Sequence, residues 1–207
     1  MGSYWEDRFQ TEGKVWGETP SVITTKVISS FRQRGVKQVL VLGAGYGRNT
    51  KELAKYFKVD GIEVSGAAVK LAREWDTHSN VIHASVLDVK LPQKYDAVFC
   101  YNLLHLFKRQ ERNVIIDKCS EFLRKGGSGF FTVFSDEDSS CGKGSLLEPN
   151  TYEYKQGKFA HFFNELDLSH HFANYTILDT GSFREQLHYA HEHSTWIDLR
   201  YVSFLKD

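Results

Sequence analysis

The residues best suited to chemistry form a glycine-rich turn, Gly43-Ala44-Gly45-Tyr46-Gly47, directly after the apolar run 39–42. Four consecutive β-prone apolar residues predict a strand buried on both faces. A helical pattern begins at Asn49, so the turn joins a strand to a helix. Glycine lets a backbone approach a ligand closely, and a helix start presents free N–H groups to an anion. The segment therefore predicts a binding corner for a nucleotide-like ligand, made by Gly43, Ala44 and Gly45.

An acidic residue follows at the distance that nucleotide-binding α/β folds use. Glu63 stands 20 residues after Gly43, at the end of the next apolar run, where a carboxylate can accept hydrogen bonds from ribose hydroxyls. The glycine spacing departs from the dinucleotide pattern G-x-G-x-x-G, because Arg48 occupies the third glycine position and the actual third glycine is Gly47. This spacing disfavours an NAD-dependent oxidoreductase and favours another adenosyl cofactor.

Two later segments carry a family resemblance. An apolar strand over 95–101 is followed by Leu103-Leu104-His105, and the next helical segment closes with Leu123-Arg124-Lys125-Gly126-Gly127. With the glycine turn and Glu63, these motifs resemble the Rossmann-like (class I) S-adenosylmethionine-dependent methyltransferases over roughly residues 36–135. Lys125 stands where that family usually has proline. In character the chain looks closest to the tellurite-resistance and thiopurine-type small-molecule methyltransferases, whose N-terminal segment is similarly aromatic.

The resemblance implies S-adenosylmethionine as the cofactor and S-adenosylhomocysteine as its product. Gly43 and Gly45 would pass under the methionine moiety and the ribose. Glu63 would hold the ribose hydroxyls, and Val64 would flank the adenine ring. The backbone around Cys100 and Tyr101 would face the methionine end.

The adenine amino group leaves two alternatives open. Ser85 stands where relatives commonly have an acid that accepts a hydrogen bond from this group, and Asp88 lies three residues further on. Either side chain is implied to read the amino group. The backbone N–H of Val86 would bind adenine N1 in both cases.

Aromatic and histidine residues outside this core are expected to line the acceptor pocket. The N-terminal stretch predicts a lid, and aromatic rings can stabilise a sulfonium by about 0.5–2 kcal/mol. Residues 136–160 predict an ordered cover, because loops longer than about 15 residues in compact domains are usually lids or disordered and this one is aromatic. The expected pocket residues are Tyr4, Trp5, Trp16, Phe134, Asp136, His161, His191 and His193.

Histidines supply the candidate acid–base groups. His105 follows the fourth strand, next to the place where the methyl group would be presented, and is the candidate catalytic residue, although relatives also keep a histidine there for structural reasons. His161, His188, His191 and His193 can line the pocket, lie exposed near a loop, or bind a transition metal. Metal sites of this kind are rarer than surface histidines, so we predict no metal.

The composition of the chain limits the classes of partner and the cellular compartment that we expect. The chain has 207 residues, 41% hydrophobic, with 26 basic and 26 acidic residues, which gives no electrostatic footprint for nucleic acid or an anionic membrane. Three cysteines without metal spacing, and the lack of a signal peptide or long apolar run, predict a cytoplasmic protein.

The element order predicts an α/β fold: a doubly wound, mostly parallel seven-stranded sheet with an antiparallel last strand and an N-terminal helical lid. A single domain is expected over 1–207, with a lid at 1–34, a cofactor core at 36–135, a cover at 136–171 and closing strands at 172–207. Helices are expected at 21–34, 48–57, 66–75 and 108–124, and strands at 36–42, 58–64, 80–84, 95–101, 128–135, 174–183 and 194–205.

These observations predict an S-adenosylmethionine-dependent methyltransferase acting on a small molecule, as a monomer or homodimer. The leading acceptor is a soft nucleophile, either a thiol or a tellurium or selenium oxyanion. The alternatives are an N- or O-directed methyltransferase of small metabolites and a non-catalytic cofactor-binding sensor or partner subunit.

Overall fold

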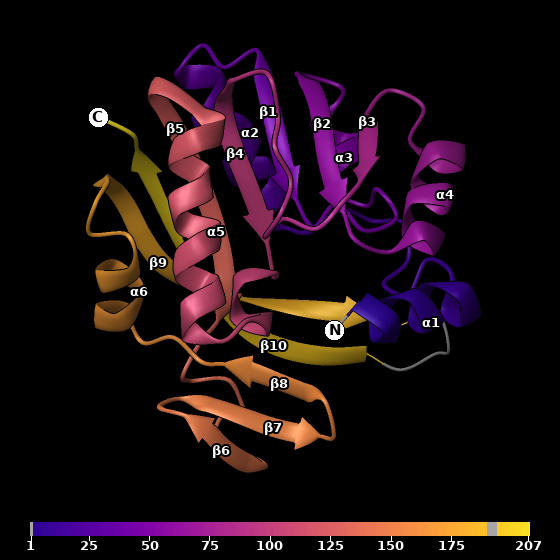
Figure 1. Cartoon of the computed structure of the whole chain (residues 1–207), viewed down its shortest axis with the longest axis vertical. Coiled ribbons are helices and arrows are strands. Elements are labelled where there is room, and N and C mark those ends of the chain that lie inside the picture. The colour runs from indigo at the N-terminus through magenta and orange to yellow at the C-terminus, as the bar shows by residue number, and fades with distance from the viewer. Residues whose placement is uncertain (1, 190–193) are drawn as a thin grey trace.

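A seven-stranded sheet lies between two layers of helices in the computed structural model, which describes residues 2–189 and 194–207 (Figure 1). The sheet order is β3-β2-β1-β4-β5-β10-β9. The first five strands run parallel, and β10 is antiparallel to both of its neighbours. The predicted doubly wound sheet with an antiparallel last strand is therefore confirmed. Its strands are β1 (Gln38–Leu42), β2 (Lys58–Glu63), β3 (Asn80–His83), β4 (Tyr95–Tyr101), β5 (Leu123–Phe134), β9 (Thr176–His188) and β10 (Ser194–Leu205).

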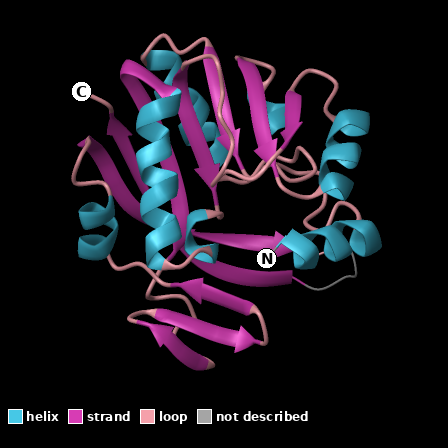
Figure 2. Cartoon of the chain, viewed as in Figure 1, coloured by secondary structure: helices cyan, strands magenta, loops and turns pink. Residues whose placement is uncertain are grey.

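The helices cover both faces of this sheet (Figure 2). Alternation along β1 explains the two layers, because Leu40 and Leu42 pack into one core while Val39 and Val41 pack into another. The first core is covered by α5 and α6, and the second by α2, α3 and α4. Among the described residues no helix has the length and apolar character needed to cross a membrane. The helices are α1 (Gly2–Glu12), α2 (Ile23–Gln33), α3 (Thr50–Leu53), α4 (Gly66–Trp75), the 3-10 turn η1 (Leu104–Leu106), α5 (Arg109–Phe122) and α6 (Glu165–His171).

Most predicted elements lie within two or three residues of the observed ones, and three differ more. The strand predicted at 174–183 continues to His188 as β9. The helix predicted at 48–57 is confined to α3, because Lys55 and Tyr56 donate to the carbonyls three residues back and tighten the chain into turns. The strand predicted at 128–135 begins earlier, at Leu123. Gly126, at φ 72°, lies in an irregular stretch of this strand that shifts its register against β4.

The long segment after β5 forms a second sheet, which the sequence did not reveal as strands. Three antiparallel strands, β6 (Ser145–Glu148), β7 (Thr151–Lys155) and β8 (Lys158–His161), extend from the edge of the molecule (Figure 1). We call this unit the cover sheet. Asn164 then caps α6, since its side chain accepts a hydrogen bond from the backbone N–H of Asp167.

Candidate active site

The glycine turn brings the backbone to the carboxyl edge of the parallel strands. Gly43 and Gly45 adopt φ angles of 69° and 56°, which favour glycine, and a Cβ at Gly43 would lie 3.0 Å from the Leu103 side chain. The N–H groups of Gly43 and Ala44 both donate to the carbonyl of Ile62, at 2.9 and 3.0 Å, so the turn is tied to β2. This geometry explains why glycine is needed directly after β1.

Glu63 ends β2 beside this turn, buried to 7% exposure. Its carboxylate accepts one hydrogen bond from the Gly45 N–H and one from the Ser65 N–H, each at 2.9 Å. Burial raises the pKa of the Glu63 carboxyl, while these N–H groups favour the ionised form. Each carboxylate oxygen keeps a lone pair for a further donor, such as a ribose hydroxyl.

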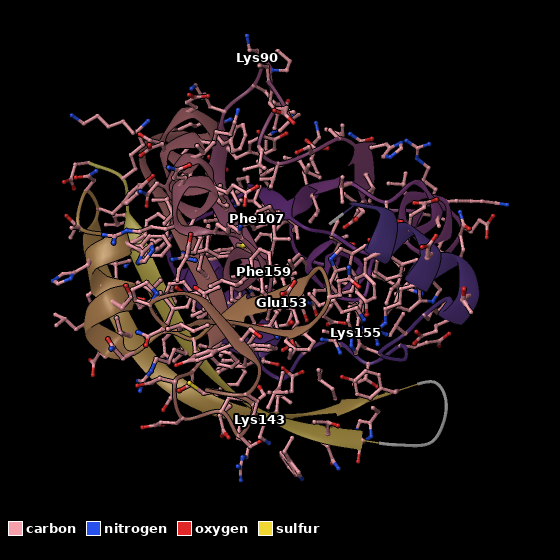
Figure 3. All side chains as sticks on the ribbon, turned by 60° about the horizontal axis from the view of Figure 1, so that its bottom comes forward. Lys90, Phe107, Lys143, Glu153, Lys155 and Phe159 are labelled. Carbon is pink, nitrogen blue, oxygen red and sulfur yellow. The ribbon has the colours of Figure 1, made fainter. Side chains whose placement is uncertain are left out.

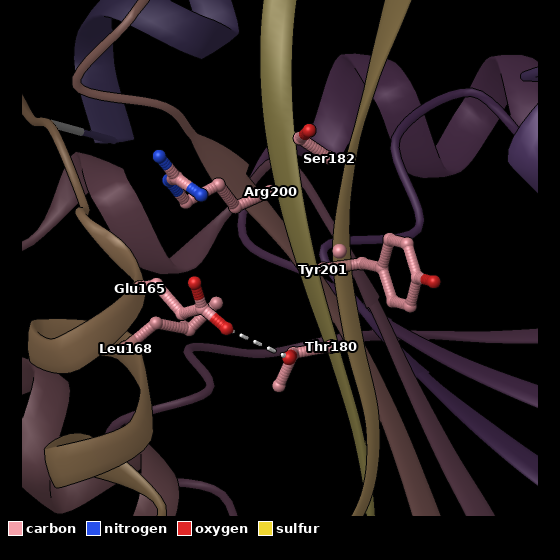
Figure 4. Close-up of a pocket in the computed structure, with 7 residues that line it drawn as sticks. Glu165, Leu168, Thr180, Ser182, Arg200 and Tyr201 are labelled. Atoms are coloured by element: carbon pink, nitrogen blue, oxygen red, sulfur yellow. Dashed lines mark hydrogen bonds between the residues drawn. The ribbon is translucent and has the colours of Figure 1, made fainter.

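A cavity of about 390 Å³ runs from the glycine turn and Glu63 to the N-terminal helix. This volume falls within the range of about 300–1,000 Å³ of small-molecule sites. A second hollow, of about 140 Å³, lies between α6 and strands β9 and β10 (Figure 4). It is too small for an adenosyl cofactor, and its Arg200 is already paired with Asp136.

The structure brings most of the predicted site residues to the larger cavity. Its lining includes Tyr4, Trp5, Trp16, Gly43, Ala44, Gly45, Glu63, Val64, Ser85, Val86, Tyr101, His105 and Phe134. These residues come from seven separate stretches of the chain and meet at one edge of the sheet.

Four predicted residues lie elsewhere. Asp88 is exposed on the loop after β3, and Cys100 is fully buried in the core beneath α5 because strand alternation points it away from the cavity. Asp136 pairs with Arg200 at 2.9 Å. His161 is buried in a network of its own, described next. His191 and His193 lie outside the described residues.

His161 joins the cover sheet to α6. Its Nδ1 lies 2.8 Å from Thr151 Oγ1, and its Nε2 lies 2.6 Å from Asp167 Oδ2. Burial lowers the pKa of His161. Burial alone would raise the pKa of Asp167, but the hydrogen bonds from His161 and His171 outweigh it and lower that pKa. Within the described part of the chain, no cluster of three or more His, Cys, Asp or Glu side chains has the arrangement of a metal site.

His105 lies on η1 at the inner end of the cavity. Its ring stacks on Phe134 with 3.9 Å between centroids and 13° between planes, and only 2% of the residue is exposed. Burial lowers the pKa of His105 to about 3, so the imidazole is neutral at physiological pH. Its buried Nδ1 has no hydrogen-bond partner among the described residues.

Aromatic rings form the opposite wall. Trp5 and Phe9 of α1 lie 5.9 Å apart, and Trp16 stacks against Tyr46 at 6.3 Å. The Tyr46 hydroxyl donates to the Gly17 carbonyl at 2.7 Å and accepts from the Trp16 N–H at 3.2 Å. The glycine turn therefore holds the N-terminal segment through Tyr46, a role that the sequence analysis missed although Tyr46 stands inside the motif.

A buried acidic residue below the cavity was also missed. Glu185 of β9 accepts hydrogen bonds from the hydroxyls of Tyr101 and Ser21, both at 2.7 Å, and lies 3.8 Å from the Arg48 guanidinium. Arg48 in turn lies 5.2 Å from the centroid of the Tyr101 ring. Glu185 lies 122 residues after Glu63, and no motif or spacing in the sequence links the two residues. Its burial in β9 becomes visible only in the folded structure.

The cover sheet contacts this region from the other side. Lys158 of β8 lies 3.6 Å from the Tyr4 ring centroid, and Tyr154 of β7 lines the cavity. Lys108, after η1, lies 5.9 Å from the Phe159 ring, and Figure 3 labels Phe159 close to Phe107 on this side of the molecule. The cover sheet therefore reaches both α1 and η1.

Comparison with known proteins agrees with this geometry. A family profile described as "Methyltransferase domain" matches residues 39–127, the stretch from β1 to the glycine pair before Ser128. An uncharacterized methyltransferase of Anoxybacillus flavithermus is 32% identical over 112 residues, which are 53% of this chain and 51% of that protein. Residues 39–127 are thus similar to a methyltransferase domain. It spans about half the length of the curated relatives it matches.

Solved structures extend this likeness to the whole fold. A structure described under "Conversion of a Disulfide Bond into a Thioacetal Group during Echinomycin Biosynthesis" has a TM-score of 0.78 at 16% identity, covering 100% of this chain and 92% of that one. The 1,6-didemethyltoxoflavin-N1-methyltransferase of Burkholderia thailandensis, with S-adenosylhomocysteine bound, has a TM-score of 0.71 at 17% identity, covering 99% and 86%. At these identities the likeness shows the fold. Closeness to the tellurite-resistance or thiopurine type stays a prediction.

Proposed function

We propose that the protein transfers a methyl group from S-adenosylmethionine to a small-molecule acceptor. The observation that carries this proposal is a single cavity with a ribose-type carboxylate at one end and an aromatic wall at the other. In the proposed complex Glu63 accepts hydrogen bonds from the ribose, and the glycine turn passes under the methionine moiety. Val64 flanks the adenine ring, and the backbone N–H of Val86 donates to adenine N1. Ser85 lines the cavity and Asp88 does not, which favours Ser85 as the partner of the adenine amino group.

We further propose a soft acceptor, such as a thiol or a chalcogen oxyanion. A general base works best when its pKa lies near the operating pH. His105 has a pKa lowered to about 3, so it is a poor proton acceptor for an alcohol or an ammonium group. Its unpartnered Nδ1, when it carries the proton, can instead donate a hydrogen bond to an acceptor that is already anionic. Displacement at a sulfonium then depends on alignment and the exclusion of water.

Residues 1–207 act in this proposal as one domain, with residues 1–34 as lid, 36–135 as cofactor core and 136–171 as cover. The free thiols of Cys100, Cys119 and Cys141 support a reducing compartment such as the cytoplasm.

The test is methyl transfer from labelled S-adenosylmethionine to a panel of thiols, selenite, tellurite, amines and phenols, with headspace collected for volatile products. S-adenosylhomocysteine binding is measured in parallel by calorimetry. Transfer to thiol or chalcogen acceptors supports the proposal, whereas transfer to amines or phenols alone replaces the soft acceptor with a harder one. Binding without transfer to any acceptor favours the cofactor-binding sensor. The absence of both binding and transfer contradicts the proposed function.

A further inference from the structure

A carboxylate of the N-terminal helix lies at the start of α4. Glu6 Oε2 accepts a hydrogen bond from the Ser65 hydroxyl at 2.8 Å, and both carboxylate oxygens lie 3.2 Å from the Ala67 backbone N–H, from which they accept. The N-terminus of a helix favours a negative charge, because its first N–H groups lack partners within the helix. These hydrogen bonds, that from Ser65 first, lower the pKa of Glu6, so the carboxylate is ionised at neutral pH. Figure 1 shows α1 lying across this end of α4.

Ser65 links this contact to the cofactor site. Its backbone N–H donates to Glu63 at 2.9 Å, and its hydroxyl oxygen caps α4 by accepting from the Ala68 N–H at 3.1 Å. The same hydroxyl donates its hydrogen to Glu6. The residue is fully buried, so its position is fixed by these partners. A continuous chain of hydrogen bonds therefore runs from Gly45 through Glu63 and Ser65 to Glu6.

The helix that carries Glu6 also carries one wall of the cavity. Tyr4, Trp5, Arg8 and Phe9 line the cavity, one turn or less from Glu6 along α1. Fixing the Glu6 carboxylate therefore fixes the aromatic rings over the glycine turn. No part of the proposed reaction described above uses Glu6 itself.

We propose that Glu6 is a positioning residue that latches α1 over the cofactor through Ser65, next to the carboxylate that binds the ribose. This inference rests on the proposed function, since it takes the ligand under α1 to be the S-adenosyl group. A cofactor lying beneath the aromatic wall leaves only when the wall moves. Weakening the latch therefore raises the rate of cofactor release more than it changes the rate of association.

The first readout is the dissociation rate of S-adenosylhomocysteine, measured by stopped-flow fluorescence of Trp5 and Trp16 in the full chain. Glu6→Ala removes the three contacts to Ser65 and Ala67, and also the hydrogen bond that Gln10 Nε2 donates to Glu6 at 2.9 Å. Glu6→Gln keeps an acceptor oxygen and removes the charge. We expect dissociation about three- to tenfold faster in Glu6→Ala, because partly exposed charge-assisted hydrogen bonds are weaker than buried ones. Glu6→Gln should lie between Glu6→Ala and the native chain. A loss of correctly folded protein would lower the signal amplitude without changing this rate.

Asp7→Asn is the matched control, because it removes the same charge from the neighbouring exposed position of α1. Its dissociation rate should equal that of the native chain. Unchanged rates in both Glu6 variants, or an equal increase in Asp7→Asn, would overturn the latch.

Hydrogen exchange of α1 in the ligand-free chain separates the latch from the proposed function. Glu6→Ala should exchange faster over residues 4–12 than either the native chain or Asp7→Asn. If the native chain binds no S-adenosylhomocysteine while this difference is present, the proposed function fails and the Glu6 contact stands as a structural fastening. Unchanged exchange would overturn the latch whatever binds in the cavity.

Discussion

Acid should destabilise this protein through the histidine at the inner end of the cavity. His105 is 2% exposed, and burial lowers its pKa from 6.5 to about 3. Between these two values the unfolded chain binds a proton that the folded chain does not. The free energy of unfolding is therefore fully retained above about pH 6.5 and falls as the pH drops toward 3.

The size of the effect follows from the same values. Each pKa unit corresponds to about 1.4 kcal/mol, and pH 5 lies about 1.5 units below the pKa of 6.5 of an unfolded histidine. The folded imidazole stays neutral over this interval, so His105 alone should remove about 2 kcal/mol between pH 7 and pH 5. His161, whose pKa burial also lowers, acts in the same direction and is present in every variant compared below.

Urea denaturation followed by tryptophan fluorescence at pH 7, 6 and 5 measures this loss. His105→Phe keeps a ring against Phe134 and cannot titrate, and His105→Gln gives a second non-titrating side chain. Between pH 7 and pH 5 we expect the free energy of unfolding of each variant to fall by about 2 kcal/mol less than that of the native chain. This difference does not depend on how much the substitution itself destabilises the protein at pH 7. His78→Gln, which removes a histidine at an exposed position, is the control substitution. An identical pH dependence in the native chain and both His105 variants would refute the burial argument.

Three further substitutions test the cavity and its support. Glu63→Ala should weaken S-adenosylhomocysteine binding by at least about tenfold in calorimetry, because hydrogen bonds to a charged group contribute about 1.5–3 kcal/mol; unchanged affinity would remove Glu63 from the site. Gly45→Val should abolish binding with the circular dichroism spectrum retained, because a branched side chain is strained at φ 56°; native affinity would contradict this. Glu185→Ala leaves Arg48 buried without its partner and should lower the free energy of unfolding by about 3 kcal/mol or more, and a loss below about 1 kcal/mol would show that the pair is not tightly coupled.

The cofactor end of the cavity was predictable because local sequence determines it. A glycine turn after a buried strand, and a carboxylate at the end of the next strand, occupy adjacent positions whenever the two strands are parallel neighbours. The register of β1 against β2 places Leu42 opposite Ile62, so Gly43 and Glu63 meet at one edge. Strand alternation places the side chain of Cys100 in the core, whereas only the backbone at this position was expected to face the methionine end.

The acceptor end was less predictable because its residues meet only through tertiary packing. Tyr46 acts by binding the backbone near Gly17, and Glu185 acts by accepting hydrogen bonds from Ser21 and Tyr101. None of these pairs has a spacing that a sequence pattern reports. The strands of the cover sheet were missed for another reason: each is only four or five residues long, and only β7 alternates aromatic and polar residues.

The sulfonium charge of the proposed cofactor favours an acceptor that brings its own negative charge. Arg48 is balanced by Glu185, His105 is neutral, and aromatic rings make up much of the remaining wall. In such weakly polar surroundings a sulfonium and a thiolate attract strongly, and their charges cancel as the methyl group moves between them. A neutral amine or alcohol would instead create a cation that must lose a proton, and the buried His105 is a poor acceptor for it. The low pKa of His105 and the aromatic wall therefore support the same choice of acceptor on independent grounds.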